Sequence, residues 1–371
     1  MTVFFKFLKD KSLLTALFII ITCELLMQFG CYKPFLRKHS YAQNINHITD
    51  TAITSLNSLN PNVLIVGTSI AYEGISVERL NRALDKKGFI FQNIGIPGSE
   101  LIIQDLALRK ILANKNQIKY IIHVNELHLP WVNRKKIIDS SLAMLGEFDR
   151  SVSVKRLRED EYDVNWKDYS SIFIKWISYR KDIGDLILKP DKRWKESRRF
   201  KKNNTESPFA YTNIYTQSLS HFQFNDLSDC KIKTSPGSLI PEGSDRHHLD
   251  AVHKTCSLVS DTKLSLDRNE DTELFKIRLK NLYSFIKSQN IKIINIYPPV
   301  SSYLDHKDHQ TRKEFWDKEF EDILSNMKLD LTDVIPEKNN SDYYYDVIHL
   351  NQKGMQIFTD SLAKSILELK I

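Results

Sequence analysis

The sequence lacks the marks of several protein classes. Its 371 residues contain no internal repeat, low-complexity tract or heptad run, which argues against solenoids, disordered polymers and coiled coils. A formal net charge of +7 is modest for this length; it favours an anionic surface or polymer mildly and nucleic acid only weakly. We therefore expect an ordinary folded protein with no nucleic acid as a partner.

Cysteine is scarce, with four residues in the chain. Cys23 and Cys31 lie in or beside an apolar N-terminal stretch, and neither has a convincing lipoprotein box. Cys230 and Cys256 can pair if the body lies outside the cytoplasm, but sequence does not fix the distance between them. The histidines near Cys256 match no strong zinc spacing, so we expect no metal and no cofactor. These histidines are His247, His248 and His253.

Charge is nearly absent from the stretch between Leu13 and Gly30, where Glu24 is the only charged residue. Such a stretch is long enough to span a bilayer, and we interpret residues 1–31 as a cytoplasmic tip and an uncleaved transmembrane signal anchor. A cleaved signal peptide is the alternative, but basic residues separate its small-residue site at 40–42 from the apolar run. Basic residues flank both ends, so charge does not settle orientation; we expect the body to be extracytoplasmic, periplasmic or at the cell surface.

The pattern beyond residue 60 is that of an α/β domain. Residues 32–60 read as a polar stalk with helical potential. Short apolar runs then alternate with helical patterns at 77–87, at 100–114 and after Asn351, which predicts a three-layer α/β/α sandwich with a parallel sheet over residues 61–371. Residues 132–275 are far more than a crossover needs and are interpreted as an insertion or lid, with a basic stretch at 189–202. The predicted strands are Val63–Val66, Phe89–Phe91, Tyr120–Val124 and Ile291–Ile296.

Two distant motifs hold the candidate catalytic residues. Ser69 follows the first predicted strand, and Asp346 and His349 precede the last helix. Serine, histidine and aspartate are the nucleophile, base and orienting acid of acyl transfer, and this chain order is that of hydrolase-like sheets. Alone, each motif is as easily a turn; together they predict a triad.

Three blocks resemble the SGNH (GDSL-type) hydrolase superfamily. Gly67-Thr68-Ser69-x4-Gly74 is similar to its first block, Asn93-x-Gly95-x-x-Gly98 to its second, and Asp346-x-x-His349-Leu350-Asn351-x-x-Gly354 to its last. The resemblance implies Ser69, Asp346 and His349 as catalytic residues, and backbone N–H groups of Ser69 and Gly95 with Asn125 as the oxyanion hole. The third block departs: His123-Val124-Asn125-Glu126 replaces a Gly-x-Asn-Asp motif.

The nearer resemblance is to membrane-anchored envelope proteins, such as those of teichoic acid D-alanyl transfer and alginate O-acetylation. It implies a serine esterase or O-acyltransferase acting on an envelope glycan or glycolipid, with a membrane-bound O-acyltransferase as a donor partner. One alternative is a catalytically silent assembly or binding protein on the same fold, which the unusual third block favours. A secreted lipase-like hydrolase is a weaker alternative, because no credible cleavage site is present.

Overall fold

The computed structural model describes residues 11–38, 40–114, 117–132, 134–203, 213–260, 268–304, 306–324 and 327–369. Five strands are present in these ranges: β1 (Val63–Val66), β2 (Phe91–Asn93), β3 (Tyr120–Val124), β4 (Lys292–Tyr297) and β5 (Lys328–Asp330). The helices before β4 are α2 (Lys11–Gln28), α3 (Tyr41–Ser58), α4 (Ser69–Gly74), α5 (Val77–Leu84), α6 (Leu101–Leu112), α7 (Leu129–Val132), α8 (Asp139–Leu145), α9 (Arg150–Glu159), α10 (Trp166–Phe173), α11 (Lys175–Ser178), α12 (Arg180–Leu188), α13 (Pro190–Asn203), α14 (Leu227–Lys233), α15 (Arg246–Ser260) and α16 (Glu270–Ser288). The later ones are α17 (His306–Glu319) and α18 (Gln352–Glu368), and short 3-10 turns lie at Lys33–Phe35 (η1), Asp85–Lys87 (η2), Leu219–His221 (η3) and Asn340–Tyr343 (η4).

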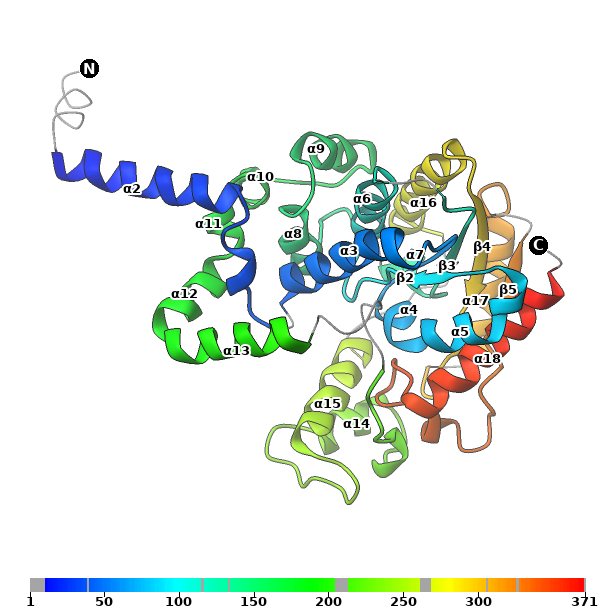
Figure 1. The fold of residues 1–371 in the computed structure, drawn as a ribbon. Helices are drawn as coiled ribbons and strands as arrows, with labels where there is room; N and C mark the ends of the chain where they lie inside the picture. Colours follow the sequence, from blue (N-terminus) through cyan, green and yellow to red (C-terminus); the bar gives the residue numbers. More distant parts are fainter. Residues whose placement is uncertain are drawn as a thin grey trace.

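The strands form one parallel sheet in the order β2-β1-β3-β4-β5 (Figure 1). This confirms the predicted α/β class with a parallel sheet. The central strands β1 and β3 have the predicted bounds, because their unbroken apolar runs are buried on both faces. The edge strand β5 is largely exposed and lacks such a run, which is why the sequence pattern does not reveal it.

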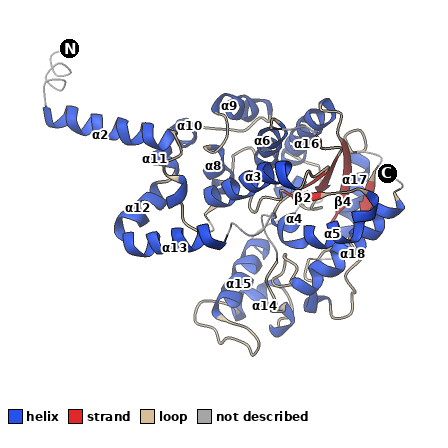
Figure 2. Ribbon diagram, viewed as in Figure 1, coloured by secondary structure: helices blue, strands red, loops and turns tan. Residues whose placement is uncertain are grey.

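Helices cover both faces of the sheet (Figure 2). Alternate residues of β1 point to opposite sides, so that Leu64 and Val66 belong to one buried cluster and Val63 and Ile65 to the other. The first cluster is completed by α3, α6, α8, α16 and α17, and the second by α5, α15 and α18. The central strands β1 and β3 are therefore buried between the two sets of helices.

The segment interpreted as a stalk is part of the body. Its helix α3 places Ile45, Ile48 and Leu56 in the first buried cluster, against α6 and α8. The helical potential of this segment is thus used for packing, because its apolar residues recur at helical spacing and bury one face.

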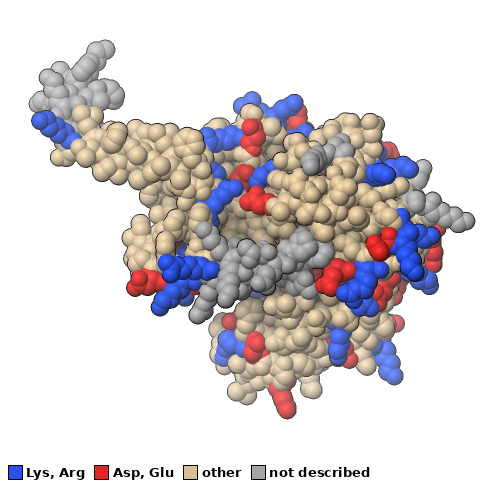
Figure 3. Space-filling view, viewed as in Figure 1, with Lys and Arg blue, Asp and Glu red and all other residues tan. Residues whose placement is uncertain are grey.

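Helix α2 projects from the body and shows almost no charged side chains along its visible surface (Figure 3). It is 18 residues long, which satisfies the length and composition needed to cross a membrane, and only 6% of it is buried. Its inner end contacts the insertion: the Glu24 carboxylate accepts the backbone N–H groups of Lys175 and Trp176, at the start of α11, at 2.9 and 3.1 Å. Helix α2 therefore contacts the body at α11.

A disulfide joins Cys230 of α14 to Cys256 of α15. This resolves the pairing that the sequence left open. The two helices pack together and against the second buried cluster, where both cysteines are fully buried.

Candidate active site

Ser69 is the first residue of α4, directly beyond the end of β1. The turn between them requires Gly67, because a Cβ there would lie 2.8 Å from the Cβ of Ala71 and 3.2 Å from that of Val124. The Thr68 hydroxyl caps the helix by accepting the N–H of Ile70. Ser69 is thereby held at the carboxyl end of a buried strand, partly open to solvent.

The structure brings the two distant motifs together. His349 Nε2 lies 2.9 Å from Ser69 Oγ, and its Nδ1 lies 2.9 Å from Asp346 Oδ2. In the neutral imidazole, a carboxylate beside Nδ1 favours the tautomer with the proton on Nδ1, which leaves Nε2 to accept from the serine hydroxyl. The imidazole is 20% exposed and the carboxylate 4%. The arrangement has the connectivity of a nucleophile, base and orienting acid.

Local hydrogen bonds fix the loop that carries Asp346 and His349. Asp346 Oδ1 accepts the backbone N–H groups of Ile348 and His349, both at 2.8 Å. Asn351 then caps α18 by accepting the N–H groups of Lys353 and Gly354 at 3.0 and 3.1 Å. Both catalytic candidates of this loop therefore have little rotational freedom.

Gly95 lies against α4. A Cβ on this glycine would be 2.7 Å from the backbone nitrogen of Tyr72. Its N–H donates to Asn93 Oδ1 at 2.8 Å, and Asn93 Nδ2 donates to the carbonyl of Ala71 at 2.7 Å. The N–H of Gly95 thus already has an acceptor, and Asn93 ties the end of β2 to α4.

Asn125 is fully buried. Its Nδ2 donates to the Tyr283 hydroxyl and to Asn295 Oδ1, both at 3.2 Å. Among the hydrogen bonds of the described residues, none joins its side chain to Ser69 or His349. Its amide thus hydrogen-bonds to residues of α16 and β4 in the buried core. The N–H of Ser69, at the start of α4, has no intrahelical acceptor.

Two carboxylates that the sequence patterns did not single out lie close to the triad. The Thr68 hydroxyl donates a short hydrogen bond to Glu126, which is buried. Glu73 is one helical turn after Ser69, and burial is the main reason that its pKa is raised. Two features of the sequence could have indicated these carboxylates. Glu126 directly follows Asn125 in the third block, and Glu73 is four residues after Ser69, which is one helical turn.

These carboxylates determine the charge of the imidazole. Burial of His349 favours its neutral form. The negative charge of Asp346, with those of Glu73 and Glu126, outweighs burial and raises the pKa of the imidazole to about 10. At neutral pH the resting site therefore holds an imidazolium among carboxylates.

The insertion forms one wall of the site. Asn213 Nδ2 donates to the carbonyls of Glu73 and Leu350, at 3.0 and 2.9 Å. Tyr215 stacks on Tyr345 with ring centroids 4.0 Å apart, and Tyr345 donates its N–H to the carbonyl of His349. This aromatic pair places a rigid apolar surface beside the catalytic loop.

No protein-family model and no curated protein match this sequence. The candidate site is therefore supported by its geometry alone. Across the described ranges, no group of three histidine, cysteine or acidic side chains is arranged to hold a metal. From the sequence, a metal site was also considered at the histidines near Cys256. In the structure, Cys256 is in the disulfide, and His248 Nε2 lies 2.6 Å from the carbonyl oxygen of Tyr345.

Proposed function

We propose that this protein is a membrane-anchored serine esterase or O-acyltransferase of SGNH type, acting on acyl esters, O-acetyl above all, of an envelope glycan or glycolipid. The observation that carries the proposal is the contact of His349 with both Ser69 and Asp346. Its support from the fold is the parallel sheet with helices on both faces, which is consistent with the three-layer sandwich of that superfamily. No metal or cofactor has a part in the proposed reaction.

The proposed reaction has two acyl-transfer steps. Ser69 Oγ attacks the ester carbonyl while its proton passes to neutral His349, and Asp346 stabilises the imidazolium. The C–O bond to the leaving alcohol breaks, that alcohol takes the proton, and an acyl-serine remains. Water or a sugar hydroxyl then attacks the acyl group, His349 takes its proton, and the Ser69 hydroxyl is regenerated.

The oxyanion has fewer ready donors than a triad usually has. The N–H of Ser69 has no acceptor within α4, and the Gly95 N–H joins it when a substrate oxygen replaces Asn93 Oδ1. Losing one such donor typically costs roughly 3 kcal/mol of the barrier. A modest rate on simple esters follows, with the full rate depending on the true acceptor.

The proposed location is a single-pass membrane protein with an extracytoplasmic body. Helix α2 supports the anchor and the disulfide supports an oxidising compartment. A membrane-bound O-acyltransferase is the proposed donor partner. Its active site would supply the acyl group at the bilayer surface, where this chain would pass it to the polymer.

A second candidate is a catalytically silent assembly protein that binds envelope polymer through the same fold. The observations that favour it are the Gly95 N–H bonded to Asn93 and the buried Asn125 amide. Both remove donors that acyl chemistry needs.

The two candidates differ in the reactivity of Ser69. The full chain in detergent, treated with a fluorophosphonate probe, should be labelled at Ser69, and both Ser69→Ala and His349→Ala should lose the label. Ser76→Ala is the matched control, because Ser76 caps α5 and lies outside the triad. A folded chain without labelling and without aryl-acetate hydrolysis would overturn the esterase proposal in favour of the silent one.

A further inference from the structure

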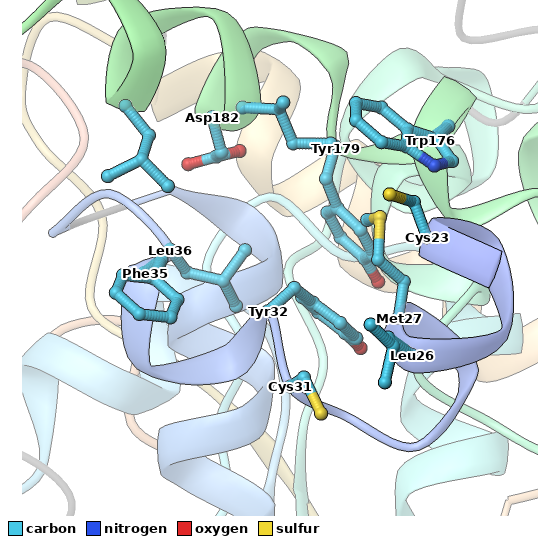
Figure 4. Close-up of a pocket in the computed structure, with 12 residues that line it drawn as sticks. Cys23, Leu26, Met27, Cys31, Tyr32, Phe35, Leu36, Trp176, Tyr179 and Asp182 are labelled. Atoms are coloured by element: carbon cyan, nitrogen blue, oxygen red, sulfur yellow. The ribbon is translucent and has the colours of Figure 1, made fainter. Parts of the chain in front are cut away.

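Two adjoining cavities lie where α2 meets the insertion. The first has a volume of about 240 Å³ and an almost wholly apolar lining (Figure 4). It is smaller than the roughly 300–1,000 Å³ of pockets that enclose a whole drug-sized ligand. A cavity of this size and lining fits one hydrocarbon chain segment. Its lining residues include Leu26, Met27, Leu36, Tyr179, Ile183 and Leu186.

The first cavity lies at the end of the apolar helix. Cys23, Leu26 and Met27 come from the last turns of α2, and the remaining wall comes from residues 31–36, α11 and α12. A helix of 18 residues is about 27 Å long, close to the roughly 30 Å of a bilayer's hydrocarbon core. If α2 spans the membrane, the cavity therefore lies at the boundary between acyl chains and headgroups.

The second cavity has both polar and apolar lining residues and a volume of about 380 Å³. It shares Tyr179 and Asp182 with the first, so the two adjoin. Arg37, Arg180 and Lys181 line it against two carboxylates. Asp182 is already matched, because it accepts the N–H of Arg37 at 2.7 Å and lies 3.5 Å from its guanidinium. The remaining charge favours an anion.

We propose that the two cavities together bind one anionic glycerophospholipid of the bilayer, with an acyl-chain segment in the apolar cavity and the phosphate in the polar one. The combination of an apolar slot at the membrane boundary and an adjoining basic pocket matches the two halves of such a lipid. The bound lipid fixes α11 and α12 against the anchor, and so sets the height of the active site above the membrane. This inference rests on the proposed anchoring of α2.

The test is lipid retention by the full chain, measured by native mass spectrometry after exchange into phosphatidylglycerol or phosphatidylcholine. The wild-type chain should retain one phosphatidylglycerol in preference to phosphatidylcholine. Leu186→Trp fills the apolar cavity and should lower retention about tenfold, the effect of a loss of 1.4 kcal/mol. Ile187→Trp is the matched control, because Ile187 is 69% exposed and does not line the cavity. The Arg180→Gln, Lys181→Gln pair should lose the preference for phosphatidylglycerol.

A second measurement needs no variant. Cys23 and Cys31 are free thiols that line the apolar cavity, so phosphatidylglycerol should slow their alkylation more than phosphatidylcholine does. Equal retention and equal alkylation with both lipids would overturn the inference, as would preferential retention of a polyprenyl phosphate over phosphatidylglycerol. Neither readout uses esterase activity. A chain that membrane extraction shows to be unanchored would instead count against the proposed location.

Discussion

His349 is the residue on which the proposed chemistry depends, because it contacts the nucleophile and is surrounded by negative charge. With its pKa raised to about 10, the imidazole is charged in the resting site at neutral pH. Since the folded pKa exceeds the ordinary value near 6.5, this charge stabilises the fold fully below pH 6.5 and ceases to do so as pH rises through about 10. The same charge blocks the base that Ser69 needs, so stability and activity have opposite dependence on pH.

We therefore expect the rate of aryl-acetate hydrolysis to rise with pH up to about 10, the pKa of His349. Glu126→Gln keeps a carbonyl oxygen for the Thr68 hydroxyl but removes a negative charge that raises this pKa. The profile should move to lower pH, and the neutral fraction of the imidazole at pH 7 should rise about tenfold if its pKa falls by one. Glu78→Gln, on the exposed side of α5, should leave the profile unchanged. Identical profiles for wild type and Glu126→Gln would contradict the assignment.

At the residue scale, the sequence predicted those site residues whose position follows from the local backbone alone. Ser69 could be placed because it follows a predicted strand. Asp346 and His349 could be placed together because they are three residues apart on one turn. Glu73 and Glu126 were not predicted as site residues. Their effect on His349 depends on how α4, the loop after β3 and the loop before α18 come together in space. Asn125 was expected at the site, but its direction depends on Tyr283, more than 150 residues away in the chain.

Helix α18 and its preceding loop show how one element holds His349, the proposed base. Asn351 caps the helix and donates its backbone N–H to the carbonyl of Tyr343 at 3.0 Å. Gly354 allows this approach, because a Cβ there would lie 2.2 Å from the same carbonyl oxygen and 2.8 Å from Leu350 Cδ2. The position of His349 thus depends on a glycine five residues further along the chain.

Gly354→Ala should destabilise the fold by about 1–3 kcal/mol, because the methyl group has no space, and should lower Ser69 labelling. The matched control is Gly184→Ala in α12, where nothing lies within 4 Å of the added methyl. Replacing that helical glycine should be neutral or stabilise by roughly 0.5–1 kcal/mol. Denaturant unfolding of both variants measures the difference. Equal stability of the two would show that the loop tolerates displacement.

Element boundaries were predictable where they depend on local signals. The cap at Asn351 and the runs of β1 and β3 are such cases. Residues 172–187, by contrast, have one amphipathic pattern but lie in three helices. Ile174 is extended between α10 and α11, and the new helix start is satisfied by Glu24, about 150 residues upstream. A cap supplied from that distance leaves no signature in the local sequence.

At the scale of the whole molecule, α2 contacts the body directly. The apolar character of α2 could be predicted from composition. Its contact with α11 and the packing of α3 into the core could not be predicted, because both depend on contacts between residues far apart in the sequence. Because α3 is in the body, no extended stalk separates the sheet from α2. If α2 spans a membrane as proposed, the proposed active site lies close to the bilayer, which suits a substrate that is itself anchored there.

The disulfide provides a test of which side of the membrane the body occupies. Disulfides persist in oxidising compartments and are rare in the cytosol. In acid-quenched cells that express the full chain, maleimide should label Cys31 without reduction, and Cys230 and Cys256 only after reduction. The crosslink spans a separation of 26 residues, for which chain entropy gives roughly 3–4 kcal/mol of stabilisation. The Cys230→Ser, Cys256→Ser pair should lose about that much in unfolding experiments, whereas Cys23→Ser, Cys31→Ser should not. Direct labelling of Cys230 and Cys256 in unreduced cells would place the body in the cytoplasm and remove the proposed access to envelope polymers.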